Sequence, residues 1–458
     1  MSKPALASLS LPVLMPSLAT SIVNAALPEL ARAFGSSFQQ AQWIVLAYLV
    51  SMTTSSVAAG KLGDRIGRRR LLTAGIVLFT SSSLLCGVAP TLATLIAARA
   101  GQGAGAALMM SLTIAIASDT ASKAGTGAAM GLLGTMSAAG TALGPALGGV
   151  LMATPGWRAI FFANVPAGLL ALLLVRRYVP GDGSTPGAHR EGADALGSFL
   201  LAVTLSAYAL AMTMGAGHFG PVNLALLLAA ACGVAGFLLA ERSAASPLVP
   251  LALLRDPAVS ASLVSSAIVS AVMMATLVVG PFYLSRALGL TAAEVGLVLS
   301  VGPGVAALSG VPAGRLVDRR GAHRMTKAGQ IGIAGGSAFL FVLPAWVGLV
   351  GYIVPIAAMT ASYALFQAAN TAAIMDGTPT TRRGLVAGLL GLSRNLGFIT
   401  GASAMGALFT LASATSDIVA ATPEAVAAGM QRTFGVAALM IVVALVVVMS
   451  STRYPHRP

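Results

Sequence analysis

Charge is scarce in this sequence: only 9% of its 458 residues are Asp, Glu, Lys or Arg. A soluble domain carries about 25% charged residues, so these residues are too few to cover a water-facing surface. The net charge of +14 does not indicate a nucleic-acid-binding protein either. Nucleic-acid binding needs a solvated basic face, whereas the basic residues here lie between long apolar segments. The composition therefore excludes an ordinary soluble protein and disfavours a nucleic-acid partner.

Cysteine and histidine are also scarce. The two cysteines, Cys86 and Cys232, lie inside apolar runs, where we expect buried thiols that behave as small apolar side chains rather than as a disulfide framework. The four histidines fall in predicted loops or the C-terminal tail: His189, His218, His323 and His456. No His, Cys or carboxylate cluster has metal-ligand spacing, and no glycine-rich loop ends in Gly-Lys-Ser/Thr. We therefore expect no enzyme, no metal site and no cofactor.

What the sequence does have is hydrophobic residues, which make up 57% of it. Apolar runs of about 18 or more residues recur, and each is long enough to cross a bilayer as a helix. They lack the strict alternation of a transmembrane β-barrel strand, so the sequence predicts an all-α polytopic membrane protein with fourteen spans. These lie near residues 9–29, 42–61, 71–90, 92–117, 127–152, 159–177, 195–215, 222–241, 259–282, 293–314, 327–344, 347–369, 384–411 and 432–451.

The first apolar run is predicted to be an uncleaved helix rather than a signal peptide. Ser17, Thr20 and Asn24 interrupt it, and it is longer than the 7–15 residues of a signal-peptide core. If the N-terminus is cytoplasmic, 21 of the 27 Lys and Arg residues fall on the cytoplasmic side, as the positive-inside rule favours. Both termini are therefore predicted to be cytoplasmic. The exceptions are four outer residues, Arg32, Arg158, Arg286 and Arg432, and two within spans, Arg99 and Arg394.

Two segments of the first half recur in the second half. Residues 60–70 (GKLGDRIGRRR) match residues 314–324 (GRLVDRRGAHR), at an offset of 254. Residues 127–151 match 384–408 at an offset of 257, mainly at glycine and leucine positions. The glycine matches alone would fit simple close packing of helices, but the charged match would not. The sequence therefore predicts two related helical bundles, an architecture of secondary transporters.

Four motifs resemble the major facilitator superfamily. Residues 60–69 (GKLGDRIGRR) resemble its charged loop between spans two and three, and residues 96–105 (IAARAGQGAG) its fourth-span motif. Residues 140–149 (GTALGPALGG) resemble the fifth-span signature of antiporters. Residues 157–166 (WRAIFFANVP), with fourteen spans, resemble the drug/proton antiporter branch. The resemblance implies a multidrug-type exporter in a bacterial-type inner membrane.

The resemblance also implies a domain organisation. Residues 1–178 would form an N-terminal six-helix bundle, and 242–458 a C-terminal six-helix bundle with a short cytoplasmic tail. Residues 179–194, which are rich in Gly, Pro and Ser, would be a cytoplasmic linker. Residues 195–241 would be two extra transmembrane helices.

The charged loop is predicted to act as a cytoplasmic gate. By resemblance, Asp64 would face the start of span thirteen near Arg383–Gly384, and Asp119 is the natural partner for Arg68 or Arg65. The positive-inside rule alone would explain the basic residues of this loop, but it would not explain an acid among glycines. An acid at a helix N-terminus is stabilised by the helix dipole. The predicted gate residues are Gly60, Asp64, Arg65, Gly67, Arg68, Asp119, Asp318 and Arg319.

Arg99 and Arg394 are the main candidates for a substrate cavity or for coupling. A charge inside a span costs at least ~2.5 kcal/mol on insertion scales and usually faces a cavity or a partner. Asn24, Arg99 and Gln102 are predicted to form one polar cluster, although Arg99 could instead snorkel outward or hold helices together. Two further candidates, for which helix packing is the alternative, are Gln367 and Asn370.

The predicted antiporter motif has both a structural and a functional interpretation. Its glycines allow close helix approach and its proline bends the span, and in the antiporter family this packing is thought to seal against leak. The residues are Gly140, Gly144, Pro145, Gly148 and Gly149.

One position departs from the antiporter pattern. The branch usually carries an acid in span one, in the pattern L-D-x-T, but this chain has Ala19 there. No carboxylate clearly lies at mid-membrane depth, so the cavity is predicted to be electropositive and to disfavour lipophilic cations.

The sequence therefore predicts a secondary active exporter of small amphiphilic compounds, neutral or anionic ones favoured, working by proton antiport through alternating access. The alternative is a metabolite or sugar-type facilitator without obligatory proton coupling. A non-transporting membrane sensor would be expected to carry an appended soluble domain. The expected partners are the small-molecule substrate, protons and the lipid bilayer, and the expected state is a monomer.

Overall fold

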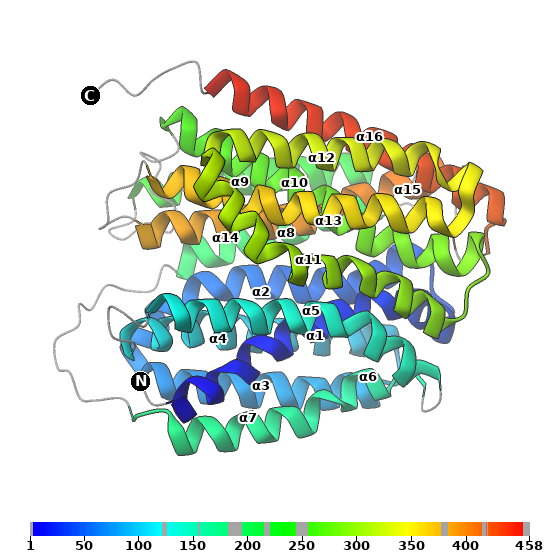
Figure 1. The fold of residues 1–458 in the computed structure, drawn as a ribbon. Coiled ribbons are helices and arrows are strands. Elements are labelled where there is room, and N and C mark those ends of the chain that lie inside the picture. Colours follow the sequence, from blue (N-terminus) through cyan, green and yellow to red (C-terminus); the bar gives the residue numbers. More distant parts are fainter. Residues whose placement is uncertain are drawn as a thin grey trace. The chain divides into compact units, whose positions relative to one another are not determined.

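The computed structural model describes residues 3–120, 126–153, 156–181, 195–214, 220–243, 255–376, 383–414, 418 and 420–451. Every regular element in these residues is a helix (Figure 1). The predicted all-helical fold is therefore confirmed. The chain divides into two compact units, the first comprising Met1–Ala211, Pro221–Leu248 and Ala292–Leu297, and the second comprising the rest.

The first unit contains the helices of the N-terminal half and the first two turns of α11. Its helices are α1 (Lys3–Ala33), α2 (Phe38–Ile66), α3 (Arg68–Val88), α4 (Leu92–Thr120), α5 (Thr126–Ala153), α6 (Ala159–Phe162), α7 (Asn164–Tyr178), nearly all of α8 (Ala195–Thr213) and α9 (Pro221–Ser243). Within it, α1 packs on α5, α2 on α4, and α3 on both α4 and α7.

The second unit contains the remaining helices. These are α10 (Pro257–Phe282), the π-helical turn η2 (Tyr283–Ala287), α11 (Ala292–Arg320) from Val298 onward, α12 (Ala322–Val342), α13 (Pro344–Asp376), α14 (Arg383–Thr400), the π-helical turn η4 (Gly401–Met405), α15 (Gly406–Ala412) and α16 (Pro423–Ser451). Here α10 packs on α14 and α16, and α12 on α13 and α16.

The surfaces of both units carry large apolar side chains. Leu173 on α7 is 66% exposed, Leu308 on α11 79% and Trp346 on α13 83%. Water would strongly disfavour such a surface, whereas lipid tails solvate it. Among the described residues, ten helices are long and apolar enough to cross a membrane. The protein is thus a polytopic membrane protein, and the count of fourteen spans stays a prediction.

The cysteines follow the prediction only in part. Both thiols are free, and Cys86 on α3 is buried as expected, but Cys232 on α9 is exposed. Its exposure does not conflict with its apolar surroundings, because the lipid-facing surface of a membrane helix is itself apolar.

The two repeated charged segments are not loops, which corrects the sequence-based expectation. Helix α2 continues through Ile66 and α3 begins at Arg68, so Gly67 alone separates them. The matching Gly321 alone separates α11 from α12. Both glycines have positive φ, 108° and 86°, a region that side-chain-bearing residues rarely adopt.

Hydrogen bonding at the two junctions is also the same. The Gly67 amide donates to the Gly63 carbonyl at 3.0 Å, and the Gly321 amide donates to the Val317 carbonyl at 2.9 Å. The Gly67 carbonyl then accepts from Leu71 as the next helix begins, and the Gly321 carbonyl accepts from Met325 in the same way. The sequence match at an offset of 254 residues thus corresponds to a shared backbone turn.

Candidate functional site

Arg99 is the largest fully buried side chain of the protein's described part, with 0% exposure. It lies on α4, and its Nε donates to the carbonyl of Ile44 on α2 at 3.0 Å. Its NH1 donates to Oε1 of Gln102. The guanidinium carbon lies 4.2 Å from the centre of the Tyr48 ring, within the range of a cation–π interaction. A carbonyl, an amide and an aromatic face therefore surround this buried charge.

The network around Arg99 extends to α1 and α3. The Gln102 Nε2 donates to the Ser83 hydroxyl at 2.7 Å, and that hydroxyl donates to the Phe79 carbonyl at 2.7 Å. The Tyr48 hydroxyl donates to the carbonyl of Pro16 on α1 at 3.1 Å. We refer to Arg99, Gln102, Tyr48 and Ser83 as the Arg99 network, and it joins the first four helices.

The glycines that follow Gln102 bring α4 close to its neighbours. A Cβ at Gly103 would collide with the Tyr48 carbonyl group, and one at Gly105 would lie 2.6 Å from the Phe79 amide nitrogen. Both helices that approach here also carry members of the Arg99 network. Residues 99–105 therefore act as one unit, in which the glycines permit the close contacts that the polar side chains then bridge.

Asn24 lies outside this hydrogen-bond network, although the sequence predicted a common cluster. Its side chain on α1 is 1% exposed, and neither its oxygen nor its nitrogen has a hydrogen-bond partner among the described residues. The structure thus brings Arg99 and Gln102 together and leaves the Asn24 amide unsatisfied. Burying an amide without hydrogen bonds costs roughly 1–3 kcal/mol, so this side chain would bind a polar group that enters its surroundings.

Tyr48 and Ser83 were not singled out from the sequence. Each is a hydroxyl-bearing residue inside an apolar span, as many others in this chain are. Their role depends on which helices pack beside α4, and single-span patterns do not contain that information. Gln102 was found because it lies three residues from Arg99, on the same helical face.

The predicted antiporter motif on α5 forms a close seam against α1. A Cβ at Gly144 would lie 2.5 Å from the Ser21 Cβ, and one at Gly148 would lie 2.9 Å from Ile22. Gly140 faces the Leu14 carbonyl in the same way. Spaced by four residues, these glycines form one stripe, which we call the α5 seam.

Pro145 is also accommodated at the α5 seam. A proline lacks the amide that would bond the carbonyl four residues earlier, which here belongs to Thr141. The Ser21 hydroxyl of α1 donates to that carbonyl at 2.8 Å. One turn away, the hydroxyls of Ser17 and Ser137 form a further hydrogen bond of 2.8 Å. A side chain of α1 thus satisfies the carbonyl that the proline leaves open.

Gly149, the last residue of this motif, lies against the start of α11. A Cβ there would be 2.9 Å from the Ala292 carbonyl oxygen, and Ala292–Leu297 belong to the same unit as α5. In return, Gly296 faces the Pro145 carbonyl. The motif therefore packs on two helices.

In the second unit, Arg394 lies on α14 and is half-buried. Its Nε is buried without a hydrogen-bond partner among the described residues, and the guanidinium is close enough to Tyr363 on α13 to interact with it electrostatically. The Tyr363 hydroxyl accepts from Nε2 of Gln367 at 2.9 Å. Arg394, Tyr363 and Gln367 thus form a half-buried polar group, of which only Tyr363 was not predicted.

Asn370, one turn further along α13, has a packing role. Its Oδ1 accepts from the Ser262 hydroxyl at 2.7 Å and its Nδ2 donates to the Ser262 carbonyl at 3.3 Å. Both bonds tie α13 to α10. The packing alternative that the sequence left open therefore has direct geometric support at this position.

Only some predicted gate residues can be placed. Gly60 lies within α2, and the side chains of Asp64, Arg65 and Asp119 lie outside the described residues. Arg68 is half-buried and its NH1 donates to the Ala115 carbonyl of α4 at 3.4 Å. The repeat counterparts Asp318 and Arg319 are exposed at the end of α11.

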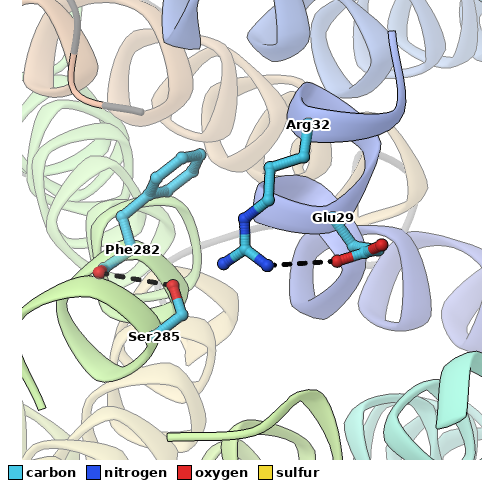
Figure 2. A network of polar contacts seen from close by, with 4 residues as sticks. All are labelled: Glu29, Arg32, Phe282 and Ser285. Atoms are coloured by element: carbon cyan, nitrogen blue, oxygen red, sulfur yellow. Dashed lines mark hydrogen bonds and ion pairs between the residues drawn. The ribbon is translucent and has the colours of Figure 1, made fainter. Parts of the chain in front are cut away.

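Glu29 is the carboxylate nearest the end of the first predicted span. It pairs with Arg32 at 3.3 Å, and both side chains are exposed, at 43% and 45% (Figure 2). A surface pair of this kind contributes about 0–1 kcal/mol. Figure 2 also shows Ser285, whose hydroxyl donates to the Phe282 carbonyl at 3.4 Å in the second unit.

The fold and these sites define a class: a polytopic helical membrane protein built with a repeated helix–glycine–helix junction. The chain belongs to the Major Facilitator Superfamily, whose family profile matches residues 13–402 and 263–458. It is therefore a membrane transporter and not an enzyme.

Known relatives are transporters. The chain is 32% identical to the uncharacterized transporter YebQ of Escherichia coli, with 83% of each chain covered. It is 30% identical to the multidrug resistance protein Stp of Mycobacterium tuberculosis, over 84% of this chain and 72% of Stp. It is 28% identical to the riboflavin transporter RibZ of Clostridioides difficile, over 87% and 86%.

A solved structure shares the fold. A bacterial homolog of the human lysosomal transporter Spinster, in an inward-facing conformation, superposes with a TM-score of 0.70. Its sequence is 16% identical, and the match covers 99% of this chain and 98% of that one. At this identity the likeness concerns the fold alone.

Proposed function

We propose that this transporter is a secondary active exporter of small amphiphilic compounds that works by proton antiport through alternating access. The α5 seam is the observation that carries the proposal. Its glycines and Pro145 match the antiporter signature, and they bring α5 into direct backbone contact with α1. A seam without room for a side chain also leaves little room for ions to leak, which an antiporter must prevent to keep its gradient. A relative named for multidrug resistance adds support.

The proposed mechanism uses two six-helix bundles, residues 1–178 and 242–458, joined through a linker at 179–194 and two extra helices at 195–241. Alternating access requires two states within a few kcal/mol of each other. A charged turn that can form and break its contacts, such as the one around Asp64, would set that balance. We propose that the protein works as a monomer with both termini in the cytoplasm.

The proposed substrates are neutral or anionic amphiphiles. Arg394 is half-buried, with its Nε unsatisfied among the described residues, and Arg99 is a buried cation in the first unit. In a membrane interior of low dielectric constant, such charges repel a lipophilic cation strongly. The relative RibZ is named as a riboflavin transporter, which fits a substrate that is not a lipophilic cation.

A facilitator without proton coupling is the second candidate, and one observation favours it. Ala19 is 1% exposed on α1, where the resemblance expects an acid, and an alanine cannot bind a proton. Coupling would then require a carboxylate elsewhere, or a substrate that carries its own ionisable group.

Charge selectivity in proteoliposomes tests the substrate proposal. Initial uptake rates of neutral, anionic and quaternary-ammonium amphiphiles of similar size would be compared for the wild type and for Arg394→Gln. We expect the wild type to prefer the neutral and anionic compounds and the variant to lose about tenfold in its preference for anions, which corresponds to ~1.4 kcal/mol. The exposed Arg255 supplies the matched control, Arg255→Gln. Strong competitive binding of the quaternary ammonium compound by the wild type would contradict the proposal.

A further inference from the structure

A basic pocket lies at the end of α3 and α7 in the first unit. It has a volume of about 580 Å³ and is lined by Arg69, Arg70, Thr73, Arg176 and Gly181. This volume lies within the range of small-molecule sites. Figure 1 shows α3 and α7 side by side, and the two helices are in contact. Positive-inside topology explains why arginines occur at this end of the helices, but it does not explain why three of them line one pocket.

Arg69 connects the two helices that form the pocket. Its NH2 donates to the carbonyl of Arg176 in the last turn of α7, where helix carbonyls lack an intrahelical partner. Its NH1 would lie 3.4 Å from a Cβ at Gly181. The Thr73 hydroxyl donates back to the Arg69 carbonyl at 2.9 Å. Arg69 therefore lies between the two helices and forms one side of the pocket.

Two further arginines line the pocket. Arg70 and Arg176 are both exposed, yet both line the pocket. Guanidinium groups bind phosphate oxygens through paired N–H donors, and arginine is the preferred residue for this task. Three arginines line this one cavity, and this concentration of positive charge suits a phosphate group better than a single carboxylate.

Next to the pocket, α3 and α7 carry exposed apolar side chains. Val77, one turn from Thr73 on α3, is 47% exposed, and Leu173, one turn from Arg176 on α7, is 66% exposed. A ligand with a phosphate headgroup and acyl chains would meet both surfaces, the arginines with its head and the apolar side chains with its tails. Basic pockets of this kind between transmembrane helices bind anionic lipid headgroups.

We infer that the pocket of Arg69, Arg70 and Arg176 is a binding site for the phosphate group of an anionic phospholipid, separate from the transport pathway. The bound lipid contacts the ends of both α3 and α7. It therefore connects the two helices in addition to the Arg69–Arg176 hydrogen bond. The site uses phosphate chemistry, which a soluble phosphate would share, and the apolar residues beside it favour the lipid.

The test uses the full-length protein in detergent and native mass spectrometry. Phosphatidylglycerol, phosphatidylcholine or inorganic phosphate is added at matched concentrations to the wild type, Arg70→Gln, Arg176→Gln and Arg177→Gln. Arg177 is the matched control, because it is an exposed arginine on the same turn that lies 5.7 Å from the Tyr178 ring and is not among the pocket residues. Size-exclusion elution verifies that each variant is folded.

We expect the wild type and Arg177→Gln to retain phosphatidylglycerol over phosphatidylcholine. Arg70→Gln and Arg176→Gln should each retain about fivefold less, since one basic residue near an anionic lipid contributes about that factor. Competition by millimolar inorganic phosphate, without any preference between the lipids, would assign the same site to a soluble phosphate. Equal retention by all four proteins, or an equal loss in Arg177→Gln, would overturn the proposal, because diffuse surface charge would then account for the binding.

Discussion

At the scale of single residues, Arg99 shows how a charge can be buried in this protein. Its described contacts are the Ile44 carbonyl, the Gln102 amide and the Tyr48 ring, and no carboxylate is among them. An arginine stays charged under all relevant conditions, so these dipoles and the ring must stabilise the charge. These contacts link α4 to α2, and the wider Arg99 network reaches α3 and α1, which supports the interpretation that Arg99 holds helices together.

Arg99→Met should therefore destabilise the protein. The change keeps much of the volume but leaves the Gln102 oxygen unsatisfied and removes the cation from the Tyr48 ring. We expect the free energy of unfolding to fall by roughly 1–3 kcal/mol, measured as a lower apparent melting temperature in detergent. Arg255→Met, at an exposed position, is the control. A melting temperature equal to that of the wild type would contradict a stabilising role for the network.

The hydroxyl of Ser21 and the ring of Pro145 should be energetically coupled. In the wild type, Ser21→Ala leaves the Thr141 carbonyl without its 2.8 Å donor and should cost about 1 kcal/mol. In a Pro145→Ala background the new amide can bond that carbonyl within the helix, so Ser21→Ala should cost little. A double-mutant cycle on unfolding free energies measures the difference. Additive effects would show that the Ser21 hydroxyl does not substitute for the amide that Pro145 lacks.

At the scale of elements, the α5 seam belongs to the most extensive described helix contact of α1. Gly140, Gly144 and Gly148 all face α1, and in the second unit Gly397 and Gly401 face α10 in a similar way. Gly397 and Gly401 correspond to Gly140 and Gly144 at the offset of 257 residues. The halves differ next to Gly401, where a π-helical turn replaces the proline-containing helix of the first half. The repeated glycines thus produce the same helix contact twice.

Gly144→Ala should disturb transport more than an equivalent change elsewhere. The new Cβ would lie 2.5 Å from the Ser21 Cβ, so α1 and α5 must separate, at a cost of about 1–3 kcal/mol for overpacking. Gly391→Ala is the matched control, since its Cβ position has no atom of another described segment within 4 Å. Transport and melting temperature would be measured for both. Equal behaviour of the two variants would mean that the seam tolerates an added methyl group.

Much of this element-level picture could be predicted from the sequence. Span lengths, the repeat and the motif glycines follow from local composition and spacing, which the helical period preserves. The partners of those glycines did not follow, because helix neighbours are set by tertiary packing. The charged segments were expected to be loops, yet α2 continues to Ile66, since lysine and arginine are as compatible with a helix as with a turn.

At the scale of the whole molecule, the two halves share a junction that only glycine accommodates well. Gly67 and Gly321 separate helix pairs with the same hydrogen bonds and positive φ. The acid of each junction, Asp64 or Asp318, precedes its glycine by three residues. Both acids are predicted gate residues: Asp318 is exposed, and the side chain of Asp64 lies outside the described residues.

Asp64→Asn should slow transport without preventing membrane insertion. Loss of the charge would weaken the proposed contact at the start of α14 and shift the balance between the two access states. We expect a fall of about tenfold in transport rate, equivalent to ~1.4 kcal/mol, at unchanged surface level. Asp318→Asn should have a smaller effect, because that side chain is exposed. Equal transport by wild type and Asp64→Asn at matched expression would remove Asp64 from the gate.

Proton coupling is the central claim of the proposed function. It is also the claim that Ala19 puts in question, because an alanine stands where the resemblance expects a proton-binding acid. The most direct measurement is transport of a neutral amphiphile in proteoliposomes, with and without an imposed pH gradient, together with the internal pH. Proton antiport predicts accumulation that follows the gradient and collapses when an ionophore removes it, with proton flux opposite to substrate flux. Transport that proceeds at the same rate and to the same end point without the gradient would contradict antiport and establish a facilitator.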